Sequence, residues 1–238
     1  MRRGRRLVLA CLLGVAVSYA MESGSGVGQH AGIGGIAHAA GSGGGGGGMS
    51  GDVGAAASPR ELARTAHNDG MRFKRRALRM EEEATEAGDD ASRQDAQRQA
   101  RENWGKAIAA FRQSFSLDPK AHKSLNEMGY ALRRVGEFAA AVQAYDAALA
   151  MKPDFGEAIE YRAEAYLALG RLDDVKAAYL RLVELDDDLA AMLLAAMQAW
   201  SSSRAGDTSE AVQAFRAWVA ERAALARYVG GDAPDWRA

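Results

Sequence analysis

The sequence predicts an all-α protein in which helical hairpins stack side by side into a solenoid. First, a set of landmark residues recurs after 34 positions, as Pro119 and Pro153 illustrate. Second, apolar residues within each copy follow one another at steps of three and four, which places them on one face of a helix. Third, β-branched and aromatic residues are sparse while Ala, Leu, Glu and Arg are abundant, and this balance favours helices over strands.

The two clearest copies cover residues 122–155 and 156–189. The landmarks of the first copy are Leu125, Met128, Gly129, Leu132, Gly136, Phe138, Ala141, Tyr145, Ala148, Met151 and Pro153. Those of the second copy are Ile159, Arg162, Ala163, Tyr166, Gly170, Leu172, Val175, Tyr179, Leu182, Leu185 and Asp187. This period resembles the tetratricopeptide repeat (TPR), a family of helix–turn–helix pairs that stack into solenoids.

Local signals in each copy predict where its helices begin, cross and end. Gly136 lies between two periodic runs, where a glycine lets the backbone turn back on itself. Ala131 and Ala141 are small enough to let paired helices approach closely. Asp154 and Glu157 predict a capping box at the start of the next helix. One such hairpin cannot cover its own apolar face, so neighbouring repeats must cover it.

The N-terminal residues 1–20 have the three parts of a secretory signal peptide. Four arginines in the first six positions precede the apolar run Leu7–Val17, and Ser18-Tyr19-Ala20 ends the segment. The run is shorter than the ~20 apolar residues of a spanning helix. We therefore expect cleavage after Ala20 and export to the periplasm or the medium. The alternatives are a lipid on Cys11, an incomplete twin-arginine signal or an uncleaved anchor, and only the lipid or the uncleaved anchor would attach the chain to a membrane.

Residues 21–57 predict a flexible Gly/Ser-rich linker. An unbroken glycine run, Gly43–Gly48, lies within it, and ordering such a segment would cost more entropy than its few apolar side chains could offset. It does not match a phosphate-binding loop, because no strand precedes the glycines and no Lys-Ser/Thr pair follows them.

Residues 58–121 predict a first TPR-like hairpin that is longer than the others. Gly70 and Phe111 are 41 residues apart, whereas the matching Gly129 and Tyr145 are 16 apart, so 25 residues are inserted. The insertion lengthens both helices into a projecting arm with a turn at Gly88. Charges of both signs predict ion pairs between the arm's helices, and a solvated hairpin without a partner is the alternative. The charged residues are Arg75, Arg76, Arg79, Glu81, Glu82, Glu83, Arg93, Arg98 and Arg101.

Residues 190–228 predict a degenerate fourth hairpin that closes the stack. Ala190–Trp200 is apolar almost all round, which indicates a buried helix. Asp207 and Glu210 predict a capping box before a final amphipathic helix. Residues 229–238 are expected to form a tail.

No constellation for catalysis, metal binding or cofactor binding is found, so we expect a protein that is not an enzyme. His67 and His122 lie in different repeats without ligand spacing, and Asp186-Asp187-Asp188 lacks the glycine and spaced glutamate of a calcium loop. Cys11 is the sole cysteine. The formal net charge of −1 gives no general bias toward nucleic acid.

The TPR resemblance implies that the first helices line a concave groove that binds a peptide or protein segment. The groove would be basic toward its N-terminal side and acidic in the third repeat, where acids would repel the C-terminal carboxylate that some TPR domains bind. His67, Met71 and Leu167 also fall at these positions. The expected groove residues are Arg64, Lys74, Arg75, Lys123, Asn126, Tyr130, Arg133, Arg134, Glu157, Glu160 and Glu164.

We therefore expect an exported TPR adaptor or scaffold whose partner is a protein. The alternative is a structural component of an envelope complex that self-associates into a homo-oligomer through its last helix or its arm.

Overall fold

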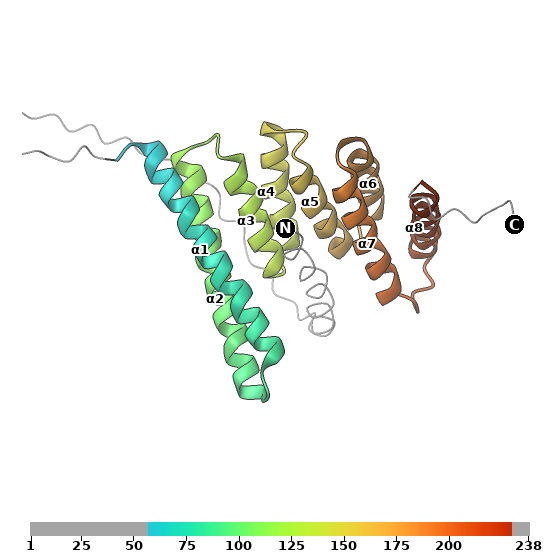
Figure 1. Cartoon of the computed structure of the whole chain (residues 1–238), viewed down its shortest axis with the longest axis horizontal. Coiled ribbons are helices and arrows are strands. Elements are labelled where there is room, and N and C mark those ends of the chain that lie inside the picture. Colours follow the sequence, from blue (N-terminus) through green and yellow to red (C-terminus); the bar gives the residue numbers. More distant parts are fainter. Residues whose placement is uncertain (1–56, 230–238) are drawn as a thin grey trace, which may run out of the picture. The chain divides into compact units, whose positions relative to one another are not determined.

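The computed structural model describes residues 57–229, which form eight α-helices and no strand (Figure 1). The expected all-α stack of hairpins is confirmed. The expectations for the signal peptide, most of the linker and the C-terminal tail lie outside the described residues. The helices are α1 (Pro59–Glu86), α2 (Asp90–Leu117), α3 (His122–Arg134), α4 (Phe138–Met151), α5 (Gly156–Leu169), α6 (Leu172–Leu185), α7 (Asp187–Ser203) and α8 (Glu210–Val229).

The eight helices pack as four consecutive hairpins (Figure 1). Each second helix, α2, α4 or α6, also packs against the first helix of the next hairpin. In addition, α3 packs against α5 and α5 against α7, so the first helices form one continuous side of the stack. We call the side lined by α1, α3, α5 and α7 the first-helix face. Within residues 57–229, no helix has both the length and the hydropathy needed to cross a bilayer.

The apolar core lies both within and between the hairpins. Its larger cluster of buried side chains extends from Leu132 to Val219 and includes Tyr145, Leu182 and Phe215, each with no exposed surface. A smaller cluster joins Ala77, Trp104 and Phe111 of the first hairpin to Tyr130 of the second. Burying a side chain of this size contributes about 1.5–3 kcal/mol. Because every hairpin covers part of its neighbour, the stability of the stack depends on adjacent repeats.

Small residues allow the two helices of a hairpin to cross closely, as the period predicts. Cβ atoms placed on Gly70 and Gly129 would lie 2.5 Å and 2.6 Å from ring atoms of Phe111 and Tyr145. The third hairpin has Ala163 at this position, with no exposed surface. The first two crossings therefore place the backbone of a first helix directly against an aromatic ring of the second.

The first hairpin forms the arm that the insertion predicts. Helices α1 and α2 have 28 residues each, compared with 13 and 14 for α3 and α4, and their ends project beyond the rest of the stack (Figure 1). The seam between them consists largely of alanines. The buried alanines are Ala63, Ala66, Ala77, Ala84, Ala96, Ala100, Ala107 and Ala110.

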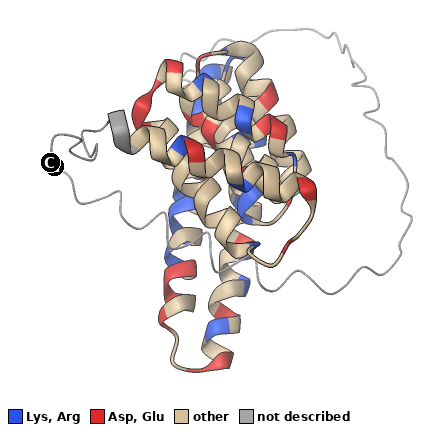
Figure 2. Ribbon diagram, turned by 90° about the vertical axis from the view of Figure 1, so that its right-hand side faces the viewer, with Lys and Arg blue, Asp and Glu red and all other residues tan. Residues whose placement is uncertain are grey.

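The ion pairs expected across the arm are not formed. Figure 2 shows acidic and basic residues along both of its helices. Among the described residues, however, no ion pair joins α1 to α2, and Arg93 and Arg98 pair with acids three residues earlier in α2. The expectation was wrong because the alanines bring the two backbones together, while long charged side chains pair more easily along their own helix. A hydrogen bond does join α2 to α1: Trp104 Nε1 donates to Glu81 Oε1 over 2.8 Å.

Two of the expected capping boxes are also absent. Helix α5 begins at Gly156 with Phe155 as its N-cap and no side-chain cap, and Asp154 binds Arg181 instead. Phe155 is buried, and its apolar contacts replace the cap. Asp207 accepts hydrogen bonds from the backbone N and Oγ of Ser209, two residues on, rather than capping α8.

We predict that Gly129→Ala lowers the free energy of unfolding by about 1–3 kcal/mol, because the new methyl group overpacks the crossing against Tyr145. Gly105→Ala in α2 is the matched control: it has open space around it and should raise stability by up to about 1 kcal/mol. Urea unfolding followed by circular dichroism measures both. Equal effects of the two substitutions would contradict the close crossing.

Candidate functional site

The structure distributes the expected groove residues along the first-helix face at different depths. Four are exposed at its surface, four are largely covered and paired with an acid or base on another helix, and three are buried. The exposed residues are Arg64, Arg75, Lys123 and Glu157; the paired ones are Lys74, Arg133, Arg134 and Glu164; the buried ones are Asn126, Tyr130 and Glu160.

The first of these pairs joins α1 to α3. Lys74 Nζ lies 2.6 Å from Glu127 Oε2, and the side chains of both residues are mostly covered. The same ammonium lies 4.0 Å from the centre of the Tyr130 ring, where the electron-rich ring face attracts it. Lys74 and Tyr130 are among the groove residues expected from the sequence, but Glu127 is not. Glu127 lies beside Asn126 on the side of α3 that faces α1.

A second pair joins α3 to α5 and is more deeply buried. Arg133 forms an ion pair with Glu164, and less than a tenth of either side chain is exposed. The guanidinium also lies over the rings of Tyr130 and Tyr161. Burial is the largest single influence and opposes the charged form of Arg133. Glu164 together with Tyr145, Tyr130 and Glu160 outweighs it, so the pKa of Arg133 rises above its ordinary value. Arg133 therefore keeps its charge despite its burial.

A third contact lies at the base of the arm. Arg134 of α3 forms an ion pair with Glu81 of α1, whose other carboxylate oxygen accepts the hydrogen bond from Trp104 of α2. One carboxylate therefore joins three helices. Glu81 was expected on the charged surface of the arm, and nothing in its spacing indicates that it faces Arg134.

These pairs change the expected charge pattern of the face. Three of the basic residues that were expected to make it basic are neutralised by acids of neighbouring helices. Among the described residues, no ion pair involves Arg64, Arg75 or Lys123, so they carry the remaining positive charge. Glu157 is exposed one repeat after Lys123, and it contributes negative charge.

Two buried polar side chains on the same face each have an oxygen atom without a hydrogen-bond partner. Asn126 and Glu160 are 1% and 2% exposed, and neither Asn126 Oδ1 nor Glu160 Oε2 has a hydrogen-bond partner. Burial raises the pKa of Glu160 to about 8; the charge of Glu164 adds to this rise and Arg133 opposes it. A buried carboxyl without a partner lowers stability, so its position needs an explanation.

A series of aromatic rings in contact lies between the charged side chains of this face. The rings of Trp104 and Tyr130 are 5.8 Å apart, those of Tyr130 and Tyr161 5.3 Å, and those of Tyr161 and Tyr145 6.4 Å. The series links four helices. Tyr161 was not among the expected residues, because the groove positions expected in the third repeat include Glu160 but not the residue that follows it.

His67 belongs to a buried hydrogen-bond chain. Its Nδ1 lies 2.9 Å from Ser124 Oγ, which lies 2.8 Å from Ser114 Oγ, and burial lowers the pKa of the histidine. A histidine beside a serine is the arrangement of a nucleophile and its base, but Ser124 is only 1% exposed, so a substrate could not reach it. The chain joins α1, α2 and α3. Residues 57–229 contain no cluster of His, Cys, Asp and Glu that could hold a metal ion.

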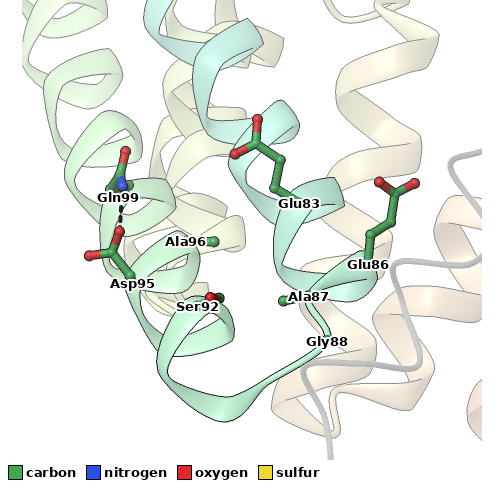
Figure 3. A pocket seen from close by; sticks show the side chains of 8 residues that line it. All are labelled: Glu83, Glu86, Ala87, Gly88, Ser92, Asp95, Ala96 and Gln99. Atoms are coloured by element: carbon green, nitrogen blue, oxygen red, sulfur yellow. Dashed lines mark hydrogen bonds between the residues drawn. The ribbon is translucent and has the colours of Figure 1, made fainter.

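Two hollows lie away from this face. One, of about 430 Å³, is at the tip of the arm between α1 and α2 (Figure 3). Glu83 and Glu86 line it from α1, and Asp95 and Gln99 from α2. The other, of about 300 Å³, lies among α4, α5 and α6 and is lined by Arg162, Tyr166 and Arg181, among others.

The chain matches the family model described as tetratricopeptide repeat over residues 85–154 and 126–190. Two similar solved structures are "First TPR of Spaghetti (RPAP3) bound to HSP90 peptide SRMEEVD" and "MamA RS-1 ArsTM double mutant". The first is 17% identical with a TM-score of 0.37, covering 63% of this chain and 95% of that one. The second is 19% identical with a TM-score of 0.38, covering 68% and 94%. The search of curated proteins found no match.

The matched residues contain the two hairpins with the 34-residue period, α3–α4 and α5–α6, and the close crossing at Gly129. Residues 85–190 therefore consist of tetratricopeptide repeats, and this supports a protein-interaction module.

Proposed function

We propose that this protein is an adaptor that binds a segment of another protein along its first-helix face. The observation that carries the proposal is the shared position of Arg64, Lys123 and Glu157. Each lies six residues before the crossing residue of its repeat, on α1, α3 and α5 respectively, and each is exposed. Three successive helices therefore offer a charged side chain at the same level, which suits an extended segment that crosses the helices.

The buried contacts beneath these residues favour binding, because they hold the surface in one shape. Lys74, Arg133 and Arg134 are each fixed by an acid on a neighbouring helix. A surface that is already ordered loses little conformational entropy when a partner binds, so more of the contact energy appears as affinity.

We further propose that the protein acts outside the cytoplasm, in the periplasm or the medium. The basic start, short apolar run and small residues of positions 1–20 support this location. The Gly/Ser-rich residues that follow would then act as a tether, which raises the local concentration of the module near any site where the N-terminus is held.

Self-association is the second candidate function, and exposed apolar side chains favour it. Leu180 and Val183 lie on one side of α6 with 50% and 47% of their surface exposed, and Leu225 on α8 is 47% exposed. An exposed apolar patch of this kind is typical of contacts between proteins.

The first prediction is that charge reversal at the face removes partner binding. The variant Arg64→Glu, Lys123→Glu, Glu157→Lys should capture the partner at least about tenfold less well than wild type, since rim charges steer and orient a charged segment. The control is Lys106→Glu, Arg112→Glu, Glu102→Lys on α2, where the residues are also exposed and the charge change is the same.

Affinity capture from envelope extract, followed by mass spectrometry, measures this difference. Circular dichroism checks that both variants fold. A partner lost equally from both variants, or retained by both, would reject the first-helix face as the binding surface.

A second prediction concerns assembly. Static light scattering should give the mass of a monomer at every concentration if the protein is an adaptor. A mass that rises with concentration, and that falls back when Leu180 and Val183 are both replaced by serine, would instead support self-association.

A third prediction concerns export. Intact-mass analysis of the protein purified from its native host should give a chain that begins at Met21. A mass that includes Met1, or a lipid on Cys11, would contradict cleavage after Ala20.

A further inference from the structure

Three exposed charges on the first-helix face form a row that crosses the helices. Arg64, Lys123 and Glu157 lie in α1, α3 and α5, each six residues before the crossing residue of its hairpin. Among the described residues, none of the three forms an ion pair. Glu61, one turn before Arg64, is held in the capping box of α1 by Ser58. The row is therefore available to charges of opposite sign on a partner.

The row has a fixed order of charge, which is positive, positive and negative from α1 through α3 to α5 (Figure 1). It ends there, because the next equivalent position, 34 residues after Glu157, is Ala191 in α7, which is exposed but uncharged. Arg75 is also exposed, but it lies eleven residues after Arg64, about 16 Å farther along α1. Arg75 is therefore outside the row.

The spacing of the row follows from the packing of the first helices. Lys74 joins α1 to α3 through Glu127, and Arg133 joins α3 to α5 through Glu164, so successive first helices are in side-chain contact. Helices in contact have axes about 8–10 Å apart. Because the three charges occupy equivalent positions on these helices, each is separated from the next by about this distance.

An extended segment that crosses the row must present one side chain to each helix from the same side of its backbone. In a β-strand, residues three apart point to opposite sides, and residues two apart are separated by only about 7 Å. A polyproline II helix has three residues per turn and rises about 3.1 Å per residue, so every third side chain points the same way at intervals of about 9 Å. The polyproline II geometry fits the row, and the strand does not.

The secondary structure of the face favours the same conformation. A bound strand gains much of its affinity from main-chain hydrogen bonds to the edge of a sheet, and residues 57–229 form no strand that could supply such an edge. A polyproline II segment has a fully solvated backbone without internal hydrogen bonds, so it requires none from the protein.

We propose that the partner segment binds as a polyproline II helix whose charges oppose the row: an acidic residue opposite Arg64, a second acidic residue three positions on opposite Lys123, and a basic residue three positions further opposite Glu157. This inference rests on the adaptor function above and specifies the chemistry of the partner. A uniformly acidic segment would be repelled by Glu157, and a uniformly basic one by the other two residues. The face therefore selects the order of the charges rather than their sum.

The test titrates the full chain with capped heptapeptides that have charges at the first, fourth and seventh positions and alanine or proline between them. Two ordered peptides, with the charged residues Glu, Glu, Lys or Lys, Glu, Glu, present the proposed order in the two chain directions. A shuffled peptide, with Glu, Lys, Glu, has the same composition but places two like charges against the row in either direction. NMR follows the backbone amides of Lys123 and Glu157.

We expect one ordered peptide to bind at least about fivefold more tightly than the shuffled peptide at low salt, since each exposed charge contact changes affinity by about two- to fivefold. This preference should shrink as added salt screens the contacts. Shorter peptides with charges at the first, third and fifth positions should show no preference for the same order, because their charges are too closely spaced to meet three helices.

Exchanging one charge of the protein should exchange the preference. Wild type should bind the ordered peptide more tightly than a peptide with glutamate at all three charged positions, and Glu157→Lys should reverse this ranking. Glu102→Lys on α2 is the matched control, because it makes the same charge change at an exposed residue away from the first-helix face. It should retain the wild-type ranking.

Equal behaviour of the ordered and shuffled peptides, including no binding by either, would overturn the charge order, and so would a ranking that Glu157→Lys leaves unchanged. An equally strong preference among the shorter peptides would overturn the polyproline II spacing. The adaptor function fails separately. A captured partner that survives reversal of Arg64, Lys123 and Glu157 rejects the face itself. A partner that is lost on this reversal, with no preference among the peptides, retains the face and rejects the proposed segment.

Discussion

The whole stack depends on one constraint, the close approach of a first helix to the second helix of its hairpin. Gly70 and Gly129 provide it by leaving no side chain between the backbone and the rings of Phe111 and Tyr145. Hairpins that cross at this distance leave an apolar surface on their outer sides, and the next hairpin covers it. The same spacing brings α3 within reach of α5, so the charged pairs of the first-helix face are a consequence of the crossings.

On the first-helix face, buried ion pairs lie beneath charged side chains that are exposed. Paired residues such as Arg133 and Glu164 satisfy one another, and removing one member would leave a buried charge, which typically costs about 3–5 kcal/mol. Those residues are therefore poor probes of binding, because their substitution also changes the fold. Exposed residues such as Lys123 can change without that effect, and they distinguish recognition from stability.

The sequence allowed the period, the hairpins, the crossings and the extended arm to be predicted, because each depends on residues close together or one repeat apart. The positions of the site residues followed from the same period. Their partners could not be predicted: Glu81 meets Arg134 across 53 residues, and the meeting depends on how far one hairpin rotates on the next. The capping box predicted at Asp154 was wrong for a related reason, because it too depends on packing between helices: α5 begins after Phe155, whose ring is buried.

The alanine seam of the arm has a consequence for motion. Near the stack, Trp104 and its bond to Glu81 fasten α1 to α2, whereas toward the tip Ala84 and Ala96 are the buried contacts. A methyl group removes little area from water, so the outer turns gain little free energy from staying together. They will separate and close again many times before the stack unfolds once, and their amide hydrogens will exchange with solvent correspondingly sooner.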